Sequence, residues 1–298
     1  MSVARSRSYL YVPGDRPDLM VKALSRGPDA LILDLEDAVA DSAKNAAAEC
    51  IGDFLAMHES RRDGWPEIWV RVNGGDQTVR DIESVAAKGL AGFCLAKVGG
   101  IGDVEAAAIA CLAAEVRLGL ADGSFSLMPL LETGAAVLAG AAIAGASPRV
   151  TILQIGEADL CADLNIAPSI DGHELLYIRS HVVLASAAAG IAPPVGPVST
   201  EYADPRAFRE STLDLFRLGF GSRACIHPAQ VDVVNSALTP TMAEREAAQM
   251  IADRYATSVA AGAGVVADES GRMIDLAVVR QALGTLSRVS RNENGEDA

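Results

Sequence analysis

The segment LILDLEDA at residues 31–38 starts as a strand suited to a protein core and ends in three acids. Successive side chains of a strand point to opposite faces. The three leucines therefore share one apolar face, while Ile32, Asp34 and Glu36 share the other, and Asp37 follows at the strand end. A strand of this kind is buried along its length and carries charge only where it ends.

Two further segments repeat this arrangement. In IWVRVN at 68–73, Arg71 and Asn73 lie on one alternating face, and in SLMPLLE at 126–132 the last residue of such a face is Glu132. Parallel strands of a barrel all end at the same mouth, so these polar side chains are expected to meet there. For any single acid, the alternative is a cap for the next helix.

Eight short apolar runs alternate with helix-like sequence along most of the chain. The runs are SYLYVP (8–13), ALILDLE (30–36), EIWVRVN (67–73), GFCLAKV (92–98), SLMPLLE (126–132), VTILQIG (150–156), PPVGPVS (193–199) and RACIHP (223–228). Helices are predicted between them at 17–25, 42–57, 78–88, 103–116, 134–144, 172–189 and 205–218. This alternation is typical of a parallel sheet, and eight repeats at a spacing of roughly 30 residues indicate a closed α/β fold, the (β/α)8 TIM barrel. The seventh run has the weakest strand character because it carries three prolines.

The predicted barrel occupies residues 1–236, close to the usual length of about 250 residues for this fold. Residues 237–290 follow as a C-terminal helical extension, with one helix at about 242–261, a glycine-rich link and a second helical segment. The polar end RNENGEDA, residues 291–298, is predicted to be a disordered tail.

Composition limits the classes of function. Half of the 298 residues are hydrophobic and the formal net charge is −14, which argues against sequence-independent binding to nucleic acid. The most apolar window, 133–147, is too short to span a bilayer, and the N-terminus has no signal-peptide pattern, so no membrane association is expected. Five scattered cysteines without a CxxC pair indicate reduced thiols and a cytoplasmic enzyme.

Glu132 and Asp159 follow consecutive predicted strands and are therefore neighbours around the mouth. Two close carboxylates repel each other unless a cation lies between them. Oxygen coordination completed by water and substrate suits Mg²⁺, with Mn²⁺ as the alternative. Zinc is disfavoured because the four histidines are dispersed. From spacing alone, two separate helix caps explain the pair equally well.

Arg71 suits a bidentate grip on a substrate carboxylate. The alternative is an ion pair with Glu36 or Asp37 from the neighbouring strand, and both can hold at once because the acids can orient the guanidinium. A divalent cation beside an arginine suits a 2-oxo or 2-hydroxy acid. The second-strand acids then support Arg71, Lys97 or a metal-bound water. Lys97 ends the fourth strand, and a salt bridge, a phosphate contact and a Schiff base all stay open for it.

Taken in order, these motifs resemble the citrate lyase β-subunit-like group of the HpcH/HpaI aldolase family, which includes malyl-CoA and citramalyl-CoA lyases. The matching segments are RSYLYVPGDRPDLMVKAL (7–24), DALILDLEDAV (29–39), VRVN (70–73), LAKV (95–98), PLLET (129–133), GEADL (156–160) and GFGSRACIHPAQV (219–231). The resemblance implies a Mg²⁺-bearing barrel, a homotrimer or a dimer of trimers, and a substrate thioester on CoA or an acyl carrier. It assigns the metal to Glu132 and Asp159, and the substrate carboxylate to Arg71.

The resemblance also implies contacts that spacing does not give. Basic residues near the N-terminus would help to hold the carrier phosphates, which makes Arg7, Arg16 and Lys22 candidates, with plain surface charge as the alternative. In SGRMIDLAVVRQA at 270–282, Asp275 would reach the site of a neighbouring subunit and act as an acid/base. Its alternative is a helix N-cap, and both roles can hold. The C-terminal extension is therefore expected to contact a neighbouring subunit.

Two departures from the family pattern bear on substrate identity. GEAD at 156–159 replaces the frequent order Gly-Ala-Glu-Asp, and the segment after Glu132, TGAA at 133–136, lacks the Arg-Gly of many members. The predicted function is a Mg²⁺-dependent carbon–carbon lyase of the retro-aldol type. Its substrate would be a 3-hydroxyacyl-CoA thioester such as malyl-CoA, citramalyl-CoA or a citryl thioester, cleaved to a 2-oxoacid and an acyl thioester. Two alternatives stay open, namely an aldolase for free 2-keto acids without CoA and a non-catalytic barrel subunit of a larger lyase complex.

Overall fold

The computed structural model describes residues 6–57, 64–169, 171–260, 262, 266–267 and 273–288. The described chain divides into two compact units, residues 6–235 and the residues from 236 onward.

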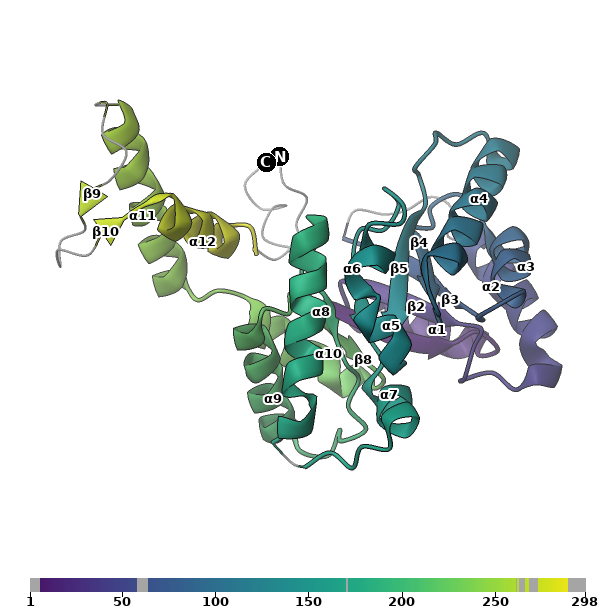
Figure 1. Ribbon diagram of the computed structural model, residues 1–298. Coiled ribbons are helices and arrows are strands. Elements are labelled where there is room, and N and C mark those ends of the chain that lie inside the picture. Colours follow the sequence, from purple (N-terminus) through teal and green to yellow (C-terminus); the bar gives the residue numbers. More distant parts are fainter. Residues whose placement is uncertain are drawn as a thin grey trace. The chain divides into compact units, whose positions relative to one another are not determined.

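The first unit is a closed parallel barrel of eight strands, and β8 returns to pair with β1 (Figure 1). The strands are β1 (Ser8–Pro13), β2 (Ala30–Asp34), β3 (Glu67–Val72), β4 (Gly92–Leu95), β5 (Ser126–Leu131), β6 (Gln154–Ile155), β7 (Val195–Gly196) and β8 (Ser222–Cys225). Each strand is followed by helix before the next begins. The predicted (β/α)8 TIM barrel is therefore confirmed.

Two strands are much shorter than the sequence predicts. β6 was expected at 150–156, but its first part is reduced to one isolated bridge between Val150 and Leu127. β7 was expected at 193–199 and keeps two paired residues. The prolines of that run lack the backbone N–H that a sheet ladder needs, which confines the pairing to the residues between them.

The helices around the barrel follow the predicted order. They are α1 (Pro17–Leu24), η1 (Asp41–Ala43), α2 (Lys44–Met57), α3 (Gln77–Val85), α4 (Ile101–Leu118), α5 (Gly134–Leu138), α6 (Gly140–Ala144), α7 (Glu157–Leu164), η2 (His173–Leu175), α8 (Leu176–Ala189), α9 (Pro205–Leu218) and α10 (Pro228–Leu238). The single helix expected at 134–144 is broken at Ala139, while α7 and α10 were not foreseen. None of the described helices has the length and apolar character needed to cross a bilayer.

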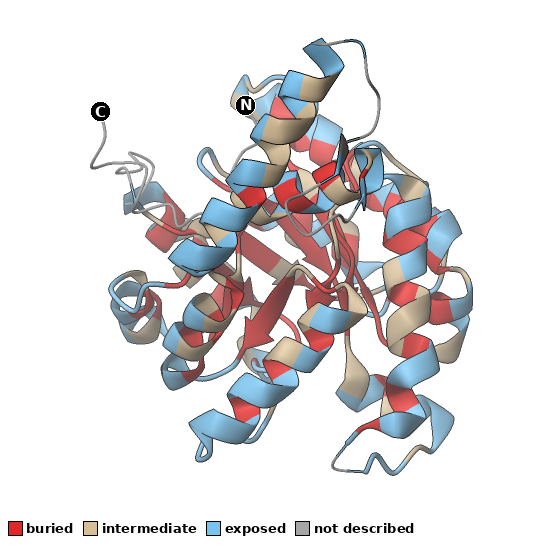
Figure 2. Cartoon of the chain, turned by 90° about the vertical axis from the view of Figure 1, so that its left-hand side faces the viewer, coloured by how far each residue is buried: buried red, intermediate tan, exposed pale blue. Residues whose placement is uncertain are grey.

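The interior of the barrel is filled by one inward face of each strand. Its buried cluster consists of Tyr9, Ala30, Ile32, Trp69, Cys94, Met128, Leu130, Ile152, Val195 and Ala224. Ile32, Trp69 and Leu130 each stand two residues before Asp34, Arg71 and Glu132, so these polar side chains continue the same inward face at the mouth. The alternate leucines of β2 are fully buried beneath the helices. Figure 2 shows the strands buried and the outer faces of the helices exposed.

A buried ion pair ties α4 to the segment before β6. Both carboxylate oxygens of Glu115 accept from the Arg149 guanidinium, at 2.6 and 2.7 Å, and also accept from the amides of Phe125 and Gly123. Burial alone would raise the pKa of Glu115, but Arg149 and the two amides outweigh it, so the pKa is lowered.

We expect Glu115→Gln to lower the free energy of unfolding by about 3 kcal/mol, because it removes the buried counter-charge of Arg149 and leaves only the exposed Asp122 as its ionic partner. The folded pKa lies below the unfolded value of about 4.3, so this stabilisation is present above pH ~4.3 and disappears as pH falls through the folded pKa. Urea denaturation from pH 7 to pH 3 checks both statements. The variant should lack part of the acid-induced loss of stability, and Glu105→Gln, at an exposed site on the same helix, should behave like wild type.

The second unit contains α11 (Met242–Ala260), α12 (Leu276–Leu286) and an antiparallel pair of short strands, β9 (Val266–Ala267) and β10 (Met273–Ile274). Thr241 and Glu244 form a reciprocal capping box at the start of α11. The predicted contact of this extension with a neighbouring subunit stays a prediction. The predicted tail at 291–298 lies outside the described residues.

Candidate active site

Glu132 comes directly after β5 and is 2 % exposed. One of its carboxylate oxygens accepts the backbone N–H of Lys97. Burial raises the pKa of Glu132 to about 7; the Lys97 amide and Arg71 oppose this rise, while Asp159 and Glu36 add to it. A buried carboxylate that faces other acids is a group that a cation would stabilise.

Asp159 stands in the first turn of α7, where its charge acts on Glu132. Gly156, the residue before this helix, allows the two elements to come close. A Cβ added there would lie 2.8 Å from the Cβ of Glu132 and 2.9 Å from its Oε2. Glu157, the first residue of α7, forms a bidentate ion pair with Arg179 of α8 at 2.6 and 2.8 Å. The start of α7 is thus held from one side by packing and from the other by charge.

Gly156→Ala is expected to weaken Mg²⁺ binding by at least about tenfold, because the added methyl must displace Glu132 and a displacement of ~1 Å is enough for such losses. The backbone itself accepts alanine, since φ at this residue is −106°. Isothermal titration with MgCl₂ measures the effect. Gly52→Ala on α2, where a methyl meets nothing within 4 Å, is the matched control. An affinity within twofold of wild type would contradict the assignment of Glu132 as a ligand.

The donor set at Glu132 and Asp159 fits Mg²⁺. Among the described residues, no group of three or more His, Cys, Asp or Glu side chains is arranged to hold a metal. Two carboxylates alone leave most coordination positions for water and substrate, as Mg²⁺ favours, whereas a structural zinc site needs four protein ligands. The alternative of two separate helix caps is not supported for Glu132. Its carboxylate accepts from the amide of Lys97, which lies in the loop after β4 and not in the helix that follows Glu132.

Arg71 on β3 is anchored by Asp34, its direct partner in the β2–β3 register. The Nε and Nη2 groups donate to the two oxygens of Asp34, both at 2.6 Å. The Asp34 carboxylate also accepts from the amides of Glu36 and Ala38, which fixes it completely. The guanidinium carbon lies 5.2 Å from the centroid of the Tyr11 ring. Arg71 is therefore rigidly held. Nη1 lies 3.0 Å from Glu36, so its second hydrogen and one hydrogen of Nη2 remain for a ligand.

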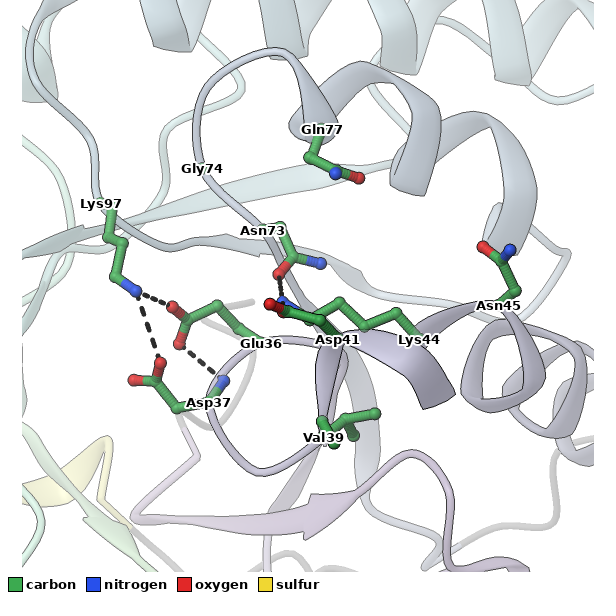
Figure 3. A pocket seen from close by; sticks show the side chains of 11 residues that line it. Glu36, Asp37, Val39, Asp41, Lys44, Asn45, Asn73, Gly74, Gln77 and Lys97 are labelled. Atoms are coloured by element: carbon green, nitrogen blue, oxygen red, sulfur yellow. Dashed lines mark hydrogen bonds and ion pairs between the residues drawn. The ribbon is translucent and has the colours of Figure 1, made fainter.

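Glu36, Asp37 and Lys97 form an ionic cluster (Figure 3), and both acids also contact Arg71. Glu36 lies 3.0 Å from Nη1 of Arg71 and pairs with the Lys97 ammonium, while Asp37 is 3.4 Å from the same ammonium. Burial raises the pKa of Glu36. The pKa of Lys97 is also raised, chiefly by Glu36. A Schiff-base lysine needs a lowered pKa, so the salt bridge is the interpretation of Lys97 that the structure supports.

A polar pocket of about 740 Å³ opens beside this cluster, between the loops that follow β2, β3 and β4 (Figure 3). Its lining includes Lys44 and Asn73. Asn73 lies at the mouth, as the strand alternation predicts, and its side-chain hydrogen bonds go to residues outside β3. It donates to the Leu35 carbonyl and to Asp81, and it accepts from Lys44. Asn73 therefore braces the loop after β3.

The structure does not bring all the expected phosphate contacts to the mouth. Arg7 precedes β1 and lies at the opposite end of the barrel, where its guanidinium is paired with Asp29 at 2.7 and 2.9 Å. This position corrects the expectation that Arg7 helps to bind substrate. Arg16 stands in the loop after β1, at the mouth, and Lys22 in the last turn of α1; both are more than half exposed and both pair with Asp18. Their roles stay predictions.

Asp275 is the N-cap of α12, and its side chain accepts from the amides of Ala277 and Val278 at 2.9 and 3.0 Å. The capping alternative for this residue is thus confirmed. Its catalytic role, which the sequence allows at the same time, stays a prediction.

Sequence reasoning missed two supports of the site. The Tyr11 hydroxyl donates to Gln154 at 3.1 Å, and its ring lies against Arg71. The alternation in SYLYVP, which puts Tyr9 and Tyr11 on one inward face, could have indicated this position. The Glu157–Arg179 pair could not be foreseen, because no local pattern connects residues 22 positions apart.

The model of the family HpcH/HpaI aldolase/citrate lyase matches residues 7–228. The chain belongs to this family. Among family relatives, the citrate lyase subunit beta of Leuconostoc mesenteroides subsp. cremoris is 30 % identical over 96 % of this chain and 94 % of that one. The L-malyl-CoA/beta-methylmalyl-CoA lyase of Rhodobacter capsulatus is 30 % identical over 93 % and 92 %.

A solved structure from the same family shows a similar arrangement. The protein CitE from Mycobacterium tuberculosis, in complex with magnesium, acetoacetate and coenzyme A, has a TM-score of 0.75 and 28 % identity. The match covers 96 % of this chain and 98 % of that one. CitE has also been crystallised with magnesium and pyruvate, a structure that matches 80 % of this chain with a TM-score of 0.65.

Proposed function

We propose that the protein is a Mg²⁺-dependent carbon–carbon lyase that cleaves a 3-hydroxyacyl-CoA thioester into a 2-oxoacid and an acyl thioester. The observation that carries this proposal is the buried Glu132 opposite Asp159, with the anchored Arg71 at the same mouth. Malyl-CoA, citramalyl-CoA and citryl thioesters are the substrate candidates. The complex of CitE with magnesium and coenzyme A and the activity named for the Rhodobacter relative support the class.

In this mechanism Glu132 and Asp159 would hold the ion, and Arg71 would bind the carboxylate of the oxoacid half. When bound, Mg²⁺ would supply positive charge beside the C2 oxygen, where negative charge develops as the C–C bond breaks. The hydroxyl gives up its proton to water, from which Asp275 would recover a proton after each turnover, and the hydroxyl oxygen becomes the keto oxygen of the 2-oxoacid. The electron pair of the broken bond passes to the acyl thioester as an enolate, whose carbon Asp275 of an adjacent subunit would protonate.

The reaction is testable in the condensation direction. Purified protein is incubated with MgCl₂, glyoxylate or pyruvate, and acetyl-CoA or propionyl-CoA, and new thioesters are separated by liquid chromatography. We expect product from at least one pair and none when EDTA is present. A protein that binds Mg²⁺ but converts no pair would contradict the lyase assignment.

One alternative has support from the comparisons. Several relatives are named as beta subunits of citrate lyase, so this barrel could serve within a larger complex. Turnover by the isolated chain would exclude a non-catalytic role. The other alternative, an aldolase for free 2-keto acids, predicts no binding of CoA at millimolar concentration in a calorimetric titration. A homotrimer or a dimer of trimers in the cytoplasm is proposed for the assembly, and light scattering measures it.

A further inference from the structure

Lys97 has an unusual backbone conformation for a residue with a long side chain. Among the described residues only Lys97 and Asn165 are non-glycine residues with positive φ, at 52° and 53°. Asn165 is a helix C-cap, where this conformation is common. A helix C-cap does not explain the positive φ of Lys97, because this residue lies in the loop between β4 and α4. A side chain is held in the left-handed region only where its surroundings fix it, and such strain is concentrated at functional sites.

This conformation lets one residue contact both halves of the candidate site. The backbone N–H of Lys97 donates to Oε1 of Glu132, the proposed metal ligand. Its ammonium group binds Glu36 and approaches Asp37 to 3.4 Å. Figure 3 shows the side chain reaching both acids from the neighbouring loop.

Gly74 makes room for the turn at Lys97. A Cβ at Gly74 would lie 2.9 Å from the Cβ of Lys97 and 3.1 Å from the carbonyl oxygen of Ala96. Asn73 braces the Gly74 loop from behind through Lys44 and Asp81. The loops after β3 and β4 are therefore packed in a way that fixes the direction of the Lys97 amide.

The charges explain why a lysine stands here. Asp34, Glu36 and Asp37 all contact the guanidinium of Arg71, so three acids share that region with Arg71 and Lys97. The cluster carries one net negative charge, and removal of Lys97 would make it two. A substrate carboxylate that approaches Arg71 would then meet stronger repulsion, because Glu36 lies 3.0 Å from Nη1 of Arg71.

We propose that Lys97 is a positioning residue with two separable tasks. Its backbone amide orients Glu132 for the metal, and its ammonium group balances Glu36 so that Arg71 can accept the carboxylate of a 2-oxoacid. This inference rests on the proposed function. It adds the residue that connects Glu132, the proposed metal ligand, with Arg71, the proposed binding group for the substrate carboxylate.

The backbone task is tested with Gly74→Ala, which pushes on Lys97 without changing any charge. Titration with MgCl₂ in the absence of substrate should show an affinity lower than wild type by about tenfold. Gly102→Ala on α4, where a methyl meets nothing within 4 Å, is the control and should bind Mg²⁺ like wild type. Equal affinities of Gly74→Ala and Gly102→Ala would overturn this half.

The charge task is tested with Lys97→Gly, because glycine adopts the left-handed backbone without strain and keeps the amide in place. Mg²⁺ affinity should stay within about threefold of wild type, whereas KM for glyoxylate or pyruvate should rise about tenfold or more, as expected for the loss of one nearby charge. Its kcat and the KM for the acyl-CoA should change less. Lys97→Arg should restore most of the oxoacid affinity. A KM for the oxoacid within twofold of wild type in Lys97→Gly would overturn this half.

These outcomes separate the inference from the proposed function. If wild type neither binds Mg²⁺ nor forms thioester product, the proposed function fails before any variant is made. If wild type does both and the Lys97 and Gly74 variants match it, the lyase stands and the inference fails.

Discussion

Glu132→Gln is expected to reduce Mg²⁺ affinity at least about 100-fold and kcat/KM about 1000-fold, because the amide removes one of two charged ligands and with it the charge stabilisation in the transition state. Glutamine has the shape of glutamate and can still accept the Lys97 N–H, so the fold around the site should persist. Calorimetric titration and the thioester assay measure the two quantities.

The same substitution has a second expected effect of opposite sign. In the metal-free protein the Glu132 carboxylate is buried and faces Asp159 and Glu36. A neutral amide abolishes this repulsion, so metal-free Glu132→Gln should melt at a higher temperature than metal-free wild type above pH 7, where Glu132 is charged. Wild type should gain stability on addition of MgCl₂ and the variant should not. A variant that keeps its Mg²⁺ affinity within threefold would show that Glu132 is not a ligand.

The sequence predicts those parts of the site that depend on the alternation of side chains along a single strand. Alternation along β2, β3 and β5 places Asp34, Arg71 and Glu132 on inward faces at strand ends, and the structure has them there. The pairing of Arg71 with second-strand acids also follows, because consecutive strands of this fold are neighbours.

What the sequence could not give depends on contacts between separate loops. The left-handed Lys97 requires room left by Gly74 and a partner in Glu132, three segments that no single pattern connects. The hydrogen bonds of Asn73 likewise come from separate segments, since its Oδ1 accepts from Lys44 and its Nδ2 donates to Asp81.

Asp275→Asn is expected to lower kcat by about 100-fold to 10,000-fold, the range for loss of a general acid/base, while Mg²⁺ affinity stays unchanged. The choice of asparagine separates catalysis from structure. Asparagine caps helices as well as aspartate does, so the hydrogen bonds to the amides of Ala277 and Val278 should survive. Asp275→Ala, which removes the acid and the cap, should lose similar activity and in addition about 1 kcal/mol of stability. An active Asp275→Asn would contradict the acid/base role.

Mixing two inactive variants tests whether Asp275 acts across subunits. Glu132→Gln lacks a ligand but has Asp275, and Asp275→Asn lacks the acid but has Glu132. In a cyclic assembly each site would combine its own Glu132 with the Asp275 of a neighbour. In a head-to-tail ring, a site is complete only where an Asp275→Asn subunit receives Asp275 from a Glu132→Gln neighbour. After random mixing of equal amounts each of these conditions holds for about half of the sites, so about a quarter of the sites should be restored. If each site used its own Asp275, no combination of the two variants would contain a complete site, and the unfolded and refolded mixture would stay inactive. Recovery of activity on mixing therefore demonstrates both the role of Asp275 and the assembly through which it acts.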